Sequence, residues 1–277
     1  MREPIFSSTR ANGVELGHWD WVADGDSIVF CHATGFHGRC WDQVIRQLST
    51  PAISLDMRSH GRSQQVAPPM HWPDFARDVA ALGETLHWQN AIGVGHSMGG
   101  YAIALAAAMR PGMFRALVLL DPVIMAPESY KGHWVDEHFA RKRRSHWGSA
   151  DEMFERFRGR GPFKAWDEQV LHDYCDHALN GSELACPPEV EGSIYENCTL
   201  PEANPYFFGI ERIDIPVVIV RSAVEFVLGF TAMEASPTDP RLASKLAKGQ
   251  DEYWREVSHF IPMEAPERVA RLISESI

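Results

Sequence analysis

The feature that most constrains the fold is a serine enclosed by glycines, in Gly95-His96-Ser97-Met98-Gly99. The apolar run at residues 91–94 precedes it, and a run of small residues, 101–108, follows it as a predicted helix. A strand that turns sharply into a helix leaves no room for bulky side chains two positions before and after the turning residue, so both positions need glycine. The pattern predicts a nucleophile elbow, with the hydroxyl of Ser97 above the carboxyl edge of a sheet and at a helix N-terminus, which favours negative charge. A packing turn without chemistry is the alternative interpretation.

Strands and helices are predicted to alternate on both sides of the elbow. Apolar runs bounded by turn residues predict buried parallel strands at 27–32, 51–56, 91–96, 114–121 and 215–221, and an opening antiparallel strand or hairpin at 13–22. Amphipathic patterns predict helices at 40–48 and 72–86, and a strand at 253–257 precedes a closing amphipathic helix. The alternation predicts an α/β fold, with a mostly parallel twisted sheet flanked by helices and joined by right-handed crossovers.

The strand pattern is interrupted between residues 123 and 213. Helical stretches separated by glycine and proline replace it, near 133–147, 150–158, 166–179 and 188–196. The sequence therefore predicts a core made of residues 1–122 and 214–277, with a helical insertion at 123–213. We expect a few aromatic side chains of the insertion to line an apolar acyl or aryl pocket, and a surface elaboration without substrate contact is the alternative.

Composition argues against several classes of function. The chain has 277 residues, 45% of them hydrophobic, which suits one domain with an insertion. Its formal charge of −11 argues against binding to nucleic acids and to anionic membranes, because both favour clustered lysine and arginine. The one basic run, 141–144, is interpreted as a solvated helix face, with attraction of an acidic substrate as the alternative.

The sequence lacks the marks of a membrane, secreted or cofactor-binding protein. No apolar run reaches the ~18 residues of a membrane helix, and the N-terminus has no apolar signal region. The five cysteines are an odd number without the density of a disulfide scaffold, so a cytoplasmic location is expected. His172, Cys175 and His177 lie at helical offsets that diverge around the axis, so no metal site is expected, and no phosphate-binding loop is present. We expect no cofactor and a small-molecule substrate as the partner, with a homodimer left open.

Four motifs give the chain a resemblance to the α/β-hydrolase superfamily, from about residue 13 to the C-terminus. In the order of that superfamily, they are His32-Ala33-Thr34-Gly35, residues 56–63, residues 95–100 and Ser258-His259-Phe260-Ile261-Pro262-Met263-Glu264. The resemblance implies the α/β-hydrolase fold, with residues 123–213 as a helical cap over the active site. In the second motif, Asp56 and Arg58 are interpreted as structural residues.

His259 is the candidate base for Ser97. A serine is a weak nucleophile until a base takes its proton. His259 follows a predicted strand and precedes the last helix, so it can reach the carboxyl edge of the sheet, whereas a surface histidine near a helix start is the alternative. The resemblance implies that the backbone amides of Met98, directly after the nucleophile, and of Thr34 form the oxyanion hole. Ala33 stands where the superfamily usually has glycine.

The acid of the catalytic triad has two candidates. The superfamily usually has it after the strand that follows the cap, three residues beyond a glycine; here Ser222 replaces the glycine and Glu225 stands in the place of the aspartate. Some members, including the haloalkane dehalogenases, have it at the end of the strand after the elbow helix, where this chain has Asp121. A carboxylate that ends a fully apolar strand is costly unless it has a partner, although Asp-Pro is also a common turn. We favour Asp121 and keep Glu225 as the alternative.

The residues and the resemblance together predict a serine hydrolase of carboxylic esters or lactones, acting on small, largely apolar substrates through an acyl-enzyme on Ser97. Serine rather than aspartate at the elbow disfavours dehalogenase and epoxide hydrolase chemistry. A carbon–carbon bond hydrolase, a cofactor-free haloperoxidase and an acyltransferase share the same triad and stay open. The alternative outside enzymes is a non-catalytic ligand receptor on the same fold.

Overall fold

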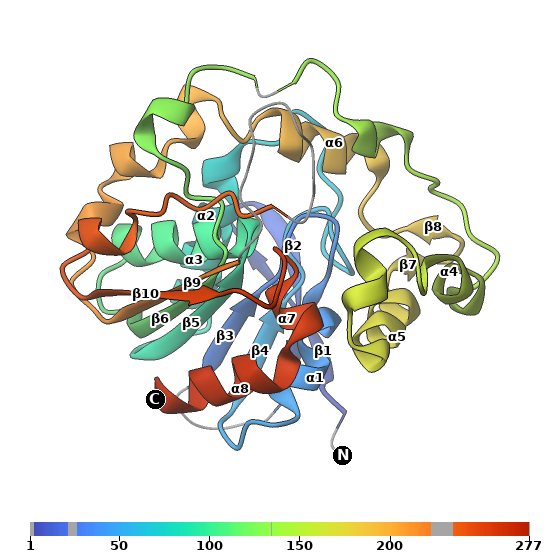
Figure 1. Cartoon of the computed structure of the whole chain (residues 1–277), viewed down its shortest axis with the longest axis horizontal. Helices are drawn as coiled ribbons and strands as arrows, with labels where there is room; N and C mark the ends of the chain where they lie inside the picture. Colours follow the sequence, from blue (N-terminus) through green and yellow to red (C-terminus); the bar gives the residue numbers. More distant parts are fainter. Residues whose placement is uncertain (1–2, 22–26, 134, 223–234, 277) are drawn as a thin grey trace.

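A computed structural model describes residues 3–21, 27–133, 135–222 and 235–276 of the chain. Within these ranges, eight strands form one sheet in the order β1-β2-β4-β3-β5-β6-β9-β10 (Figure 1). The strands are β1 (Ile5–Ala11), β2 (Val14–Asp20), β3 (Ile28–Cys31), β4 (Ala52–Leu55), β5 (Ala91–His96), β6 (Phe114–Leu120), β9 (Val217–Ser222) and β10 (Gly249–Trp254). Neighbouring strands from β4 to β10 are parallel, whereas β2 is antiparallel to both β1 and β4. The predicted α/β class with a mostly parallel sheet is confirmed.

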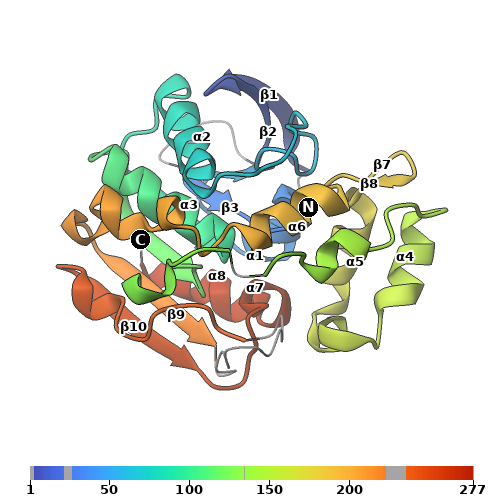
Figure 2. The same cartoon turned by 90° about the horizontal axis from the view of Figure 1, so that it is seen from above.

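Helices cover both faces of this sheet. The helices α1 (Asp42–Ile45) and α8 (Pro266–Glu275) pack on one face, and α2 (Trp72–Thr85) and α3 (Met98–Met109) pack on the other (Figure 2). Successive strand residues point to opposite faces, so Ile28 and Phe30 of β3 lie in the cluster with α1 and α8, and Val29 and Cys31 lie in the cluster with α2 and α3. Burial on both faces explains why the inner strands are continuous apolar runs.

Between β6 and β9 no described residue joins the large sheet. The segment instead contains α4 (Ala150–Phe157), α5 (Glu168–His177), the small hairpin of β7 (Leu179–Asn180) and β8 (Glu183–Leu184), α6 (Pro188–Glu196) and the 3-10 turns η2 (Pro127–Ser129), η3 (Phe139–Lys142), η4 (Gly161–Ala165), η5 (Pro201–Ala203), η6 (Pro205–Phe208) and η7 (Ile210–Arg212). The remaining short elements are η1 (Gly38–Trp41), η8 (Ala243–Lys245) and α7 (Ile261–Glu264). None of the helices in the described ranges has both the length and the apolarity needed to cross a membrane.

The helix predicted at 133–147 is wrong for the described part of that range, where only η3 forms. The side chain of His138 accepts a hydrogen bond from the amide of Ala140, and this local bond competes with helical pairing. The backbone becomes extended at Arg143, directly after η3.

The basic run 141–144 is also more than a solvated face. Arg141 forms an ion pair with Glu196 at 2.6 Å, and Arg143 forms one with Glu191 at 2.5 Å. Both carboxylates belong to α6, so the run fixes this part of the insertion to that helix. In a regular helix, Arg141 and Arg143, two positions apart, would point to opposite sides.

The apolar pattern located the two edge strands least well. β10 covers Gly249–Trp254 instead of 253–257, because exposed polar residues such as Gln250 and Asp251 give an edge strand no apolar run. β1, at the opposite edge, is only partly buried and was not predicted. The helix predicted at 40–48 forms as the 3-10 turn η1 followed by the short helix α1.

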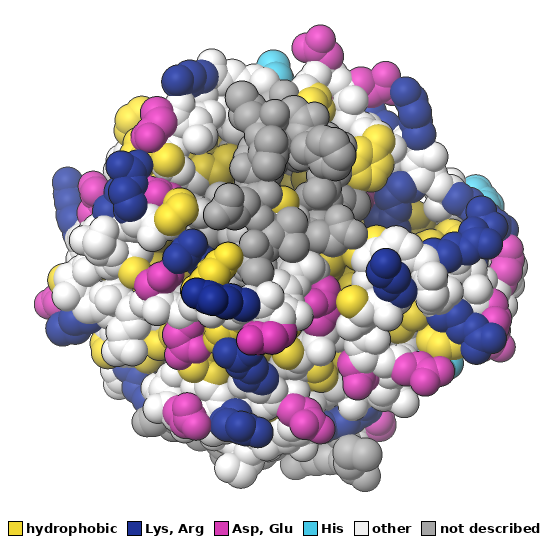
Figure 3. Space-filling view, in the orientation of Figure 1, with side chains coloured by type: hydrophobic (Ala, Val, Ile, Leu, Met, Phe, Trp, Pro, Cys, Tyr) yellow, Lys and Arg dark blue, Asp and Glu magenta, His cyan; other side chains and the backbone are white. Residues whose placement is uncertain are grey.

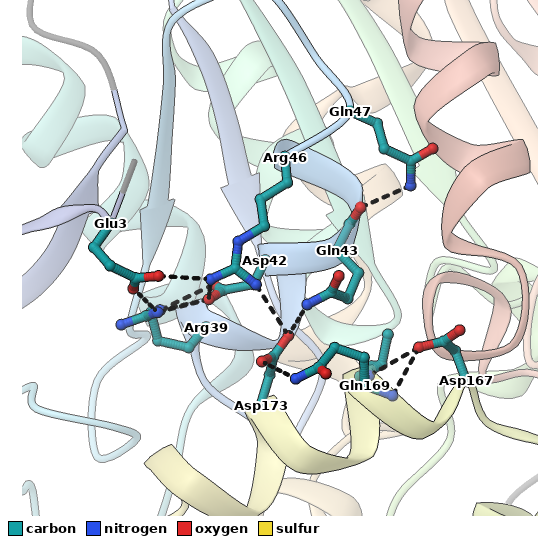
Figure 4. Close-up of polar contacts among 10 residues, drawn as sticks. Glu3, Arg39, Asp42, Gln43, Arg46, Gln47, Asp167, Gln169 and Asp173 are labelled. Atoms are coloured by element: carbon teal, nitrogen blue, oxygen red, sulfur yellow. Dashed lines mark hydrogen bonds and ion pairs between the residues drawn. The ribbon is translucent and has the colours of Figure 1, made fainter. Parts of the chain in front are cut away.

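A buried polar network joins the insertion to the core beside α1 (Figure 4). The Nε and Nη2 groups of Arg39 donate to the carboxylate of Asp42 at 2.7–2.9 Å, and both side chains are buried. Arg46 extends the network from Asp42, at 3.4 Å, to Asp173 of α5, at 3.9 Å. Gln43 also donates to Asp173. The position of α5 therefore depends on charges that belong to α1 and the turn before it.

We predict that Asp42→Asn lowers the free energy of unfolding by about 3 kcal/mol, because it leaves the buried guanidinium of Arg39 without its main carboxylate. Urea denaturation followed by circular dichroism measures this loss. Glu256→Gln is the matched control, since its ion pair with Arg268 is exposed and should contribute little. Equal stability of the two variants would contradict a structural role for the network.

Candidate active site

Ser97 lies in a strained turn between β5 and α3. Its backbone angles are φ 55° and ψ −116°, in a region that a residue with a side chain rarely adopts. A Cβ atom at Gly95 would collide with the carbonyl oxygen of Gly99, and one at Gly99 would collide with the carbonyl oxygen of Cys31. Both obstacles are backbone atoms, which cannot move aside. The structure thus explains why glycine stands on both sides of the serine.

Three of the predicted residues lie in one hydrogen-bonded chain at the carboxyl edge of the sheet. Nε2 of His259 is 2.9 Å from Oγ of Ser97, and Nδ1 of His259 is 2.8 Å from Oδ2 of Asp121. A carboxylate can only accept, so Nδ1 of His259 carries the proton and Nε2 is left with a lone pair for the hydroxyl of Ser97. Glu225, the alternative acid, lies outside the described residues.

Asp121 is fully buried at the end of β6 and is surrounded by hydroxyl donors. Ser222 donates to Oδ2 at 2.8 Å and Ser236 donates to Oδ1. The hydroxyl of Thr238 lies 3.3 Å from Oδ1 but is closer to the carbonyl of Pro122, at 2.7 Å. Burial alone would raise the pKa of Asp121, but the hydrogen bonds and charge of His259, together with Ser236 and Ser222, outweigh burial and lower this pKa. The site therefore favours the charged carboxylate.

Ser222 also explains the departure from the superfamily pattern. It ends β9, next to β6, and its hydroxyl and amide both point to Asp121. A glycine at this position could not supply the hydroxyl. The sequence marked Ser222 only as a substitution, and nothing in it indicated that Ser236, more than 110 residues from Asp121, would donate to the same carboxylate.

The loop after β3 is held beside Ser97 by two buried histidines. Nδ1 of His32 donates to the carbonyl of Ala33 at 2.7 Å, and its Nε2 accepts from the amide of Met57 at 2.9 Å. Nε2 of His60 accepts from the amide of Gly35 at 3.0 Å. Burial lowers the pKa of His60 to about 4, so this histidine is a neutral hydrogen-bonding group at ordinary pH. Sequence reasoning gave neither histidine a role.

The two residues whose backbone amides are the predicted oxyanion donors touch through their side chains. Oγ1 of Thr34 is 3.5 Å from Sδ of Met98, and Met98 is the first residue of α3. In the described part of the chain, neither backbone amide has a hydrogen-bond acceptor. Amides without acceptors beside Ser97 suit an oxyanion hole, and their role stays a prediction.

Asp56 and Arg58 make structural contacts. The carboxylate of Asp56 accepts from the amide of Gly38 at 2.7 Å and from the indole of Trp19 at 3.2 Å. Arg58 forms an ion pair with Asp78 of α2. These bonds join the loop after β4 to its neighbours and do not reach Ser97.

His96, directly before the nucleophile, contacts the backbone of His259. Its Nε2 donates to the carbonyl of His259 at 2.7 Å, and the two ring centroids are 5.0 Å apart. Burial and the neighbouring His259 lower the pKa of His96 to about 3, so its ring is neutral. Among the described residues, Nδ1 of His96 has no partner. The bond through Nε2 connects β5 to the loop that carries His259.

A cavity of about 1180 Å³ opens at Ser97 and His259, as measured on the described residues. Its walls come from the loop after β3, from α2, from the insertion, from residues 235–240 and from the ends of β9 and β10 with the loop of His259, and they are mainly apolar. The larger apolar side chains are Phe36, Trp72, Val123, Met125, Phe139, Tyr195 and Phe260. The insertion therefore supplies part of the surface that a molecule at Ser97 would contact.

The residues considered for a metal do not converge. His172 stacks on Phe154 with ring centroids 3.7 Å apart, and Cys175 is buried in the aromatic cluster of the insertion. Among the described residues, no three His, Cys, Asp or Glu side chains lie close enough together to hold a metal ion. All five cysteines are buried and have free thiols.

Comparison with known proteins agrees with this geometry. The model of the alpha/beta hydrolase family matches residues 28–272. Lipase LipV of Mycobacterium tuberculosis is 30% identical over 256 residues, which cover 89% of this chain and 91% of the lipase. A non-heme chloroperoxidase of Streptomyces lividans is 27% identical over 246 residues, which cover 84% of this chain and 86% of that protein. Among solved structures, E-2-(acetamidomethylene)succinate hydrolase superposes with a TM-score of 0.76 over 99% of this chain and 98% of that chain; its 18% identity supports the fold alone.

We predict that Asp121→Asn lowers the turnover number by about 10⁴-fold, because an amide cannot both accept the Nδ1–H of His259 and stabilise the imidazolium. Glu225→Gln is the control and should cost little. Steady-state hydrolysis of a p-nitrophenyl ester measures both variants. An inactive Glu225→Gln beside an active Asp121→Asn would assign the acid to Glu225.

We also predict that His96→Leu lowers the turnover number roughly tenfold, through the loss of one hydrogen bond to the loop of His259. The KM should change little, because His96 does not line the cavity. His96→Gln, which keeps a donor, should recover part of the rate. If leucine and glutamine are equally slow, the hydrogen bond is not the reason for the loss.

Proposed function

The chain belongs to the alpha/beta hydrolase family, and we propose that it is a serine hydrolase of carboxylic esters or lactones. The observation that carries this proposal is the hydrogen-bonded chain from Asp121 through His259 to Ser97. The similarity to a lipase over nine-tenths of each chain supports carboxylic ester chemistry.

In the first half of the proposed reaction, Ser97 attacks the substrate carbonyl while Nε2 of His259 takes its proton. Asp121 stabilises the imidazolium that forms. The amides of Thr34 and Met98 stabilise the oxyanion, at the N-terminus of α3. His259 then passes the proton to the leaving alcohol, which leaves an acyl group on Ser97.

The second half releases this acyl group. His259, again neutral, takes a proton from water, and the resulting hydroxide attacks the acyl carbon. The tetrahedral intermediate collapses, the proton returns to Ser97, and the carboxylic acid leaves. A lactone follows the same steps, with acid and alcohol released as one hydroxy acid.

We infer that the insertion at 123–213 acts as a cap that selects the substrate. It contributes Val123, Met125, Phe139 and Tyr195 to the cavity at Ser97. These side chains suit an apolar acyl or aryl group, because burying such a group against them removes apolar surface from water.

A second candidate is peroxide chemistry on the same acyl-enzyme. The similarity to a non-heme chloroperoxidase favours it. Hydrogen peroxide would replace water as the second nucleophile, and a peroxy acid would replace the carboxylic acid. Product analysis with an ester and hydrogen peroxide together separates the two, since only the second candidate yields peroxy acid in excess.

We predict that Ser97→Ala lowers ester turnover by roughly 10⁴–10⁶-fold and leaves the fold intact, because only a hydroxyl is removed. A fluorophosphonate probe should modify Ser97 in the folded wild type, as mass spectrometry of its peptides can detect. The panel of substrates is p-nitrophenyl esters of graded chain length, together with lactones. Absence of an adduct on Ser97 would refute the proposal and favour a receptor, whereas near-normal turnover by the variant would show that Ser97 is not the nucleophile.

A further inference from the structure

One segment of the insertion, residues 141–164, carries a charge opposite to that of the whole chain. Between residues 141 and 164 there are eight lysines and arginines but only three aspartates and glutamates, in a chain with a formal charge of −11. Figure 3 shows Lys and Arg side chains gathered at the right, over the region of α4, with hydrophobic side chains between them. Such a local excess of positive charge attracts anions.

Four arginines of this segment line a second cavity, of about 330 Å³, that shares no lining residue with the cavity at Ser97. They are Arg143, Arg144, Arg156 and Arg160. Arg143 forms an ion pair with Glu191, and Arg144 forms one with Glu152 at 2.7 Å. Within the described ranges, Arg156 and Arg160 have no carboxylate partner. Two of the four positive charges at this cavity are therefore uncompensated.

The remaining wall of this cavity is aromatic. Phe157 and Phe163 stack with centroids 4.5 Å apart and an interplanar angle of 2°, and Trp147 meets the edge of Phe157 at 5.2 Å. Glycines with φ of 72° and 47°, Gly159 and Gly161, flank Arg160. The turn that places Arg160 at the cavity therefore needs glycine on both sides, because glycine adopts left-handed backbone angles without strain.

We propose that this cavity binds a small phosphate monoester with a flat ring next to the phosphate. A guanidinium binds a phosphate through paired hydrogen bonds, and Arg156 and Arg160 are available for this purpose. The flat ring would pack on Phe157 and Phe163, which line the cavity and are only partly buried, whereas Trp147 is buried beneath the Arg144 guanidinium. The inorganic anion and the ester share the phosphoryl group, and only the ester gains the ring contact.

Aromatic side chains, among them Trp166 and Phe260, separate this site from Ser97. Phe163 contacts Trp166 at 4.9 Å, and Trp166 contacts Phe260, the neighbour of His259, at 5.5 Å. The proposal therefore does not rest on the proposed function, and binding should persist when Ser97 is blocked.

Isothermal titration of the wild type with phenyl phosphate tests the proposal. The double variant Arg156→Ala/Arg160→Ala should weaken binding roughly tenfold or more, and Arg156→Lys/Arg160→Lys should weaken it less. Arg158→Ala is the matched control, because Arg158 follows the same helix but pairs with Glu155 and does not line the cavity. Inorganic phosphate should bind more weakly than phenyl phosphate, and added salt should weaken both.

Several results would overturn the site. They are undetectable binding of phenyl phosphate to the wild type, equal binding by wild type and the double alanine variant, and loss of binding once a fluorophosphonate occupies Ser97. Binding of an acidic peptide without binding of phenyl phosphate would assign the arginines to a protein surface instead. All variants change exposed side chains, and circular dichroism verifies that they are folded.

Discussion

A carboxylate cannot remain charged at the end of an apolar strand unless other groups supply hydrogen bonds, and Asp121 imposes this requirement on its surroundings. Its donors come from the end of β9, from Ser236 and from the loop that carries His259. Those three parts of the chain must therefore meet at one point. The bond from Nδ1 of His259 to Asp121 fixes the tautomer of His259, so Nε2 presents a lone pair to Ser97. The arrangement of the site follows from satisfying one buried charge.

The sequence predicted the elements whose signals are local. The elbow was recognised because Gly95, Ser97 and Gly99 are close neighbours, and the inner strands were recognised because burial on both faces makes them apolar throughout. β1 was not predicted and β10 was placed too late in the chain, because edge strands contain exposed, polar residues. The helix predicted at 133–147 is wrong because the local hydrogen bond from Ala140 to His138 competes with helical pairing and the ion pairs to α6 depend on tertiary contacts.

The site divides in the same way. Ser97, His259 and Asp121 could be proposed from chain order and strand ends, and the structure brings them together. The hydroxyls around Asp121 and the bond from His96 to His259 could not be proposed, because each joins residues more than 100 positions apart. Buried histidines beside the site hold the backbone as neutral groups, since burial lowers the pKa of His60 to about 4 and that of His96 to about 3. Burial thus keeps both of these positioning histidines neutral.

The hydroxyl of Ser222 has a consequence for how this family diverges. Ser222 and Asp121 are 101 positions apart, yet one is useful only in the presence of the other. A relative with its acid beyond β9 has no carboxylate at the end of β6 to satisfy, and glycine then suffices at the position of Ser222. If the acid is Asp121, a carboxylate placed there without Ser222 would lose one of its hydrogen bonds while staying buried. The identity of this one small residue should record, across the family, which strand carries the acid.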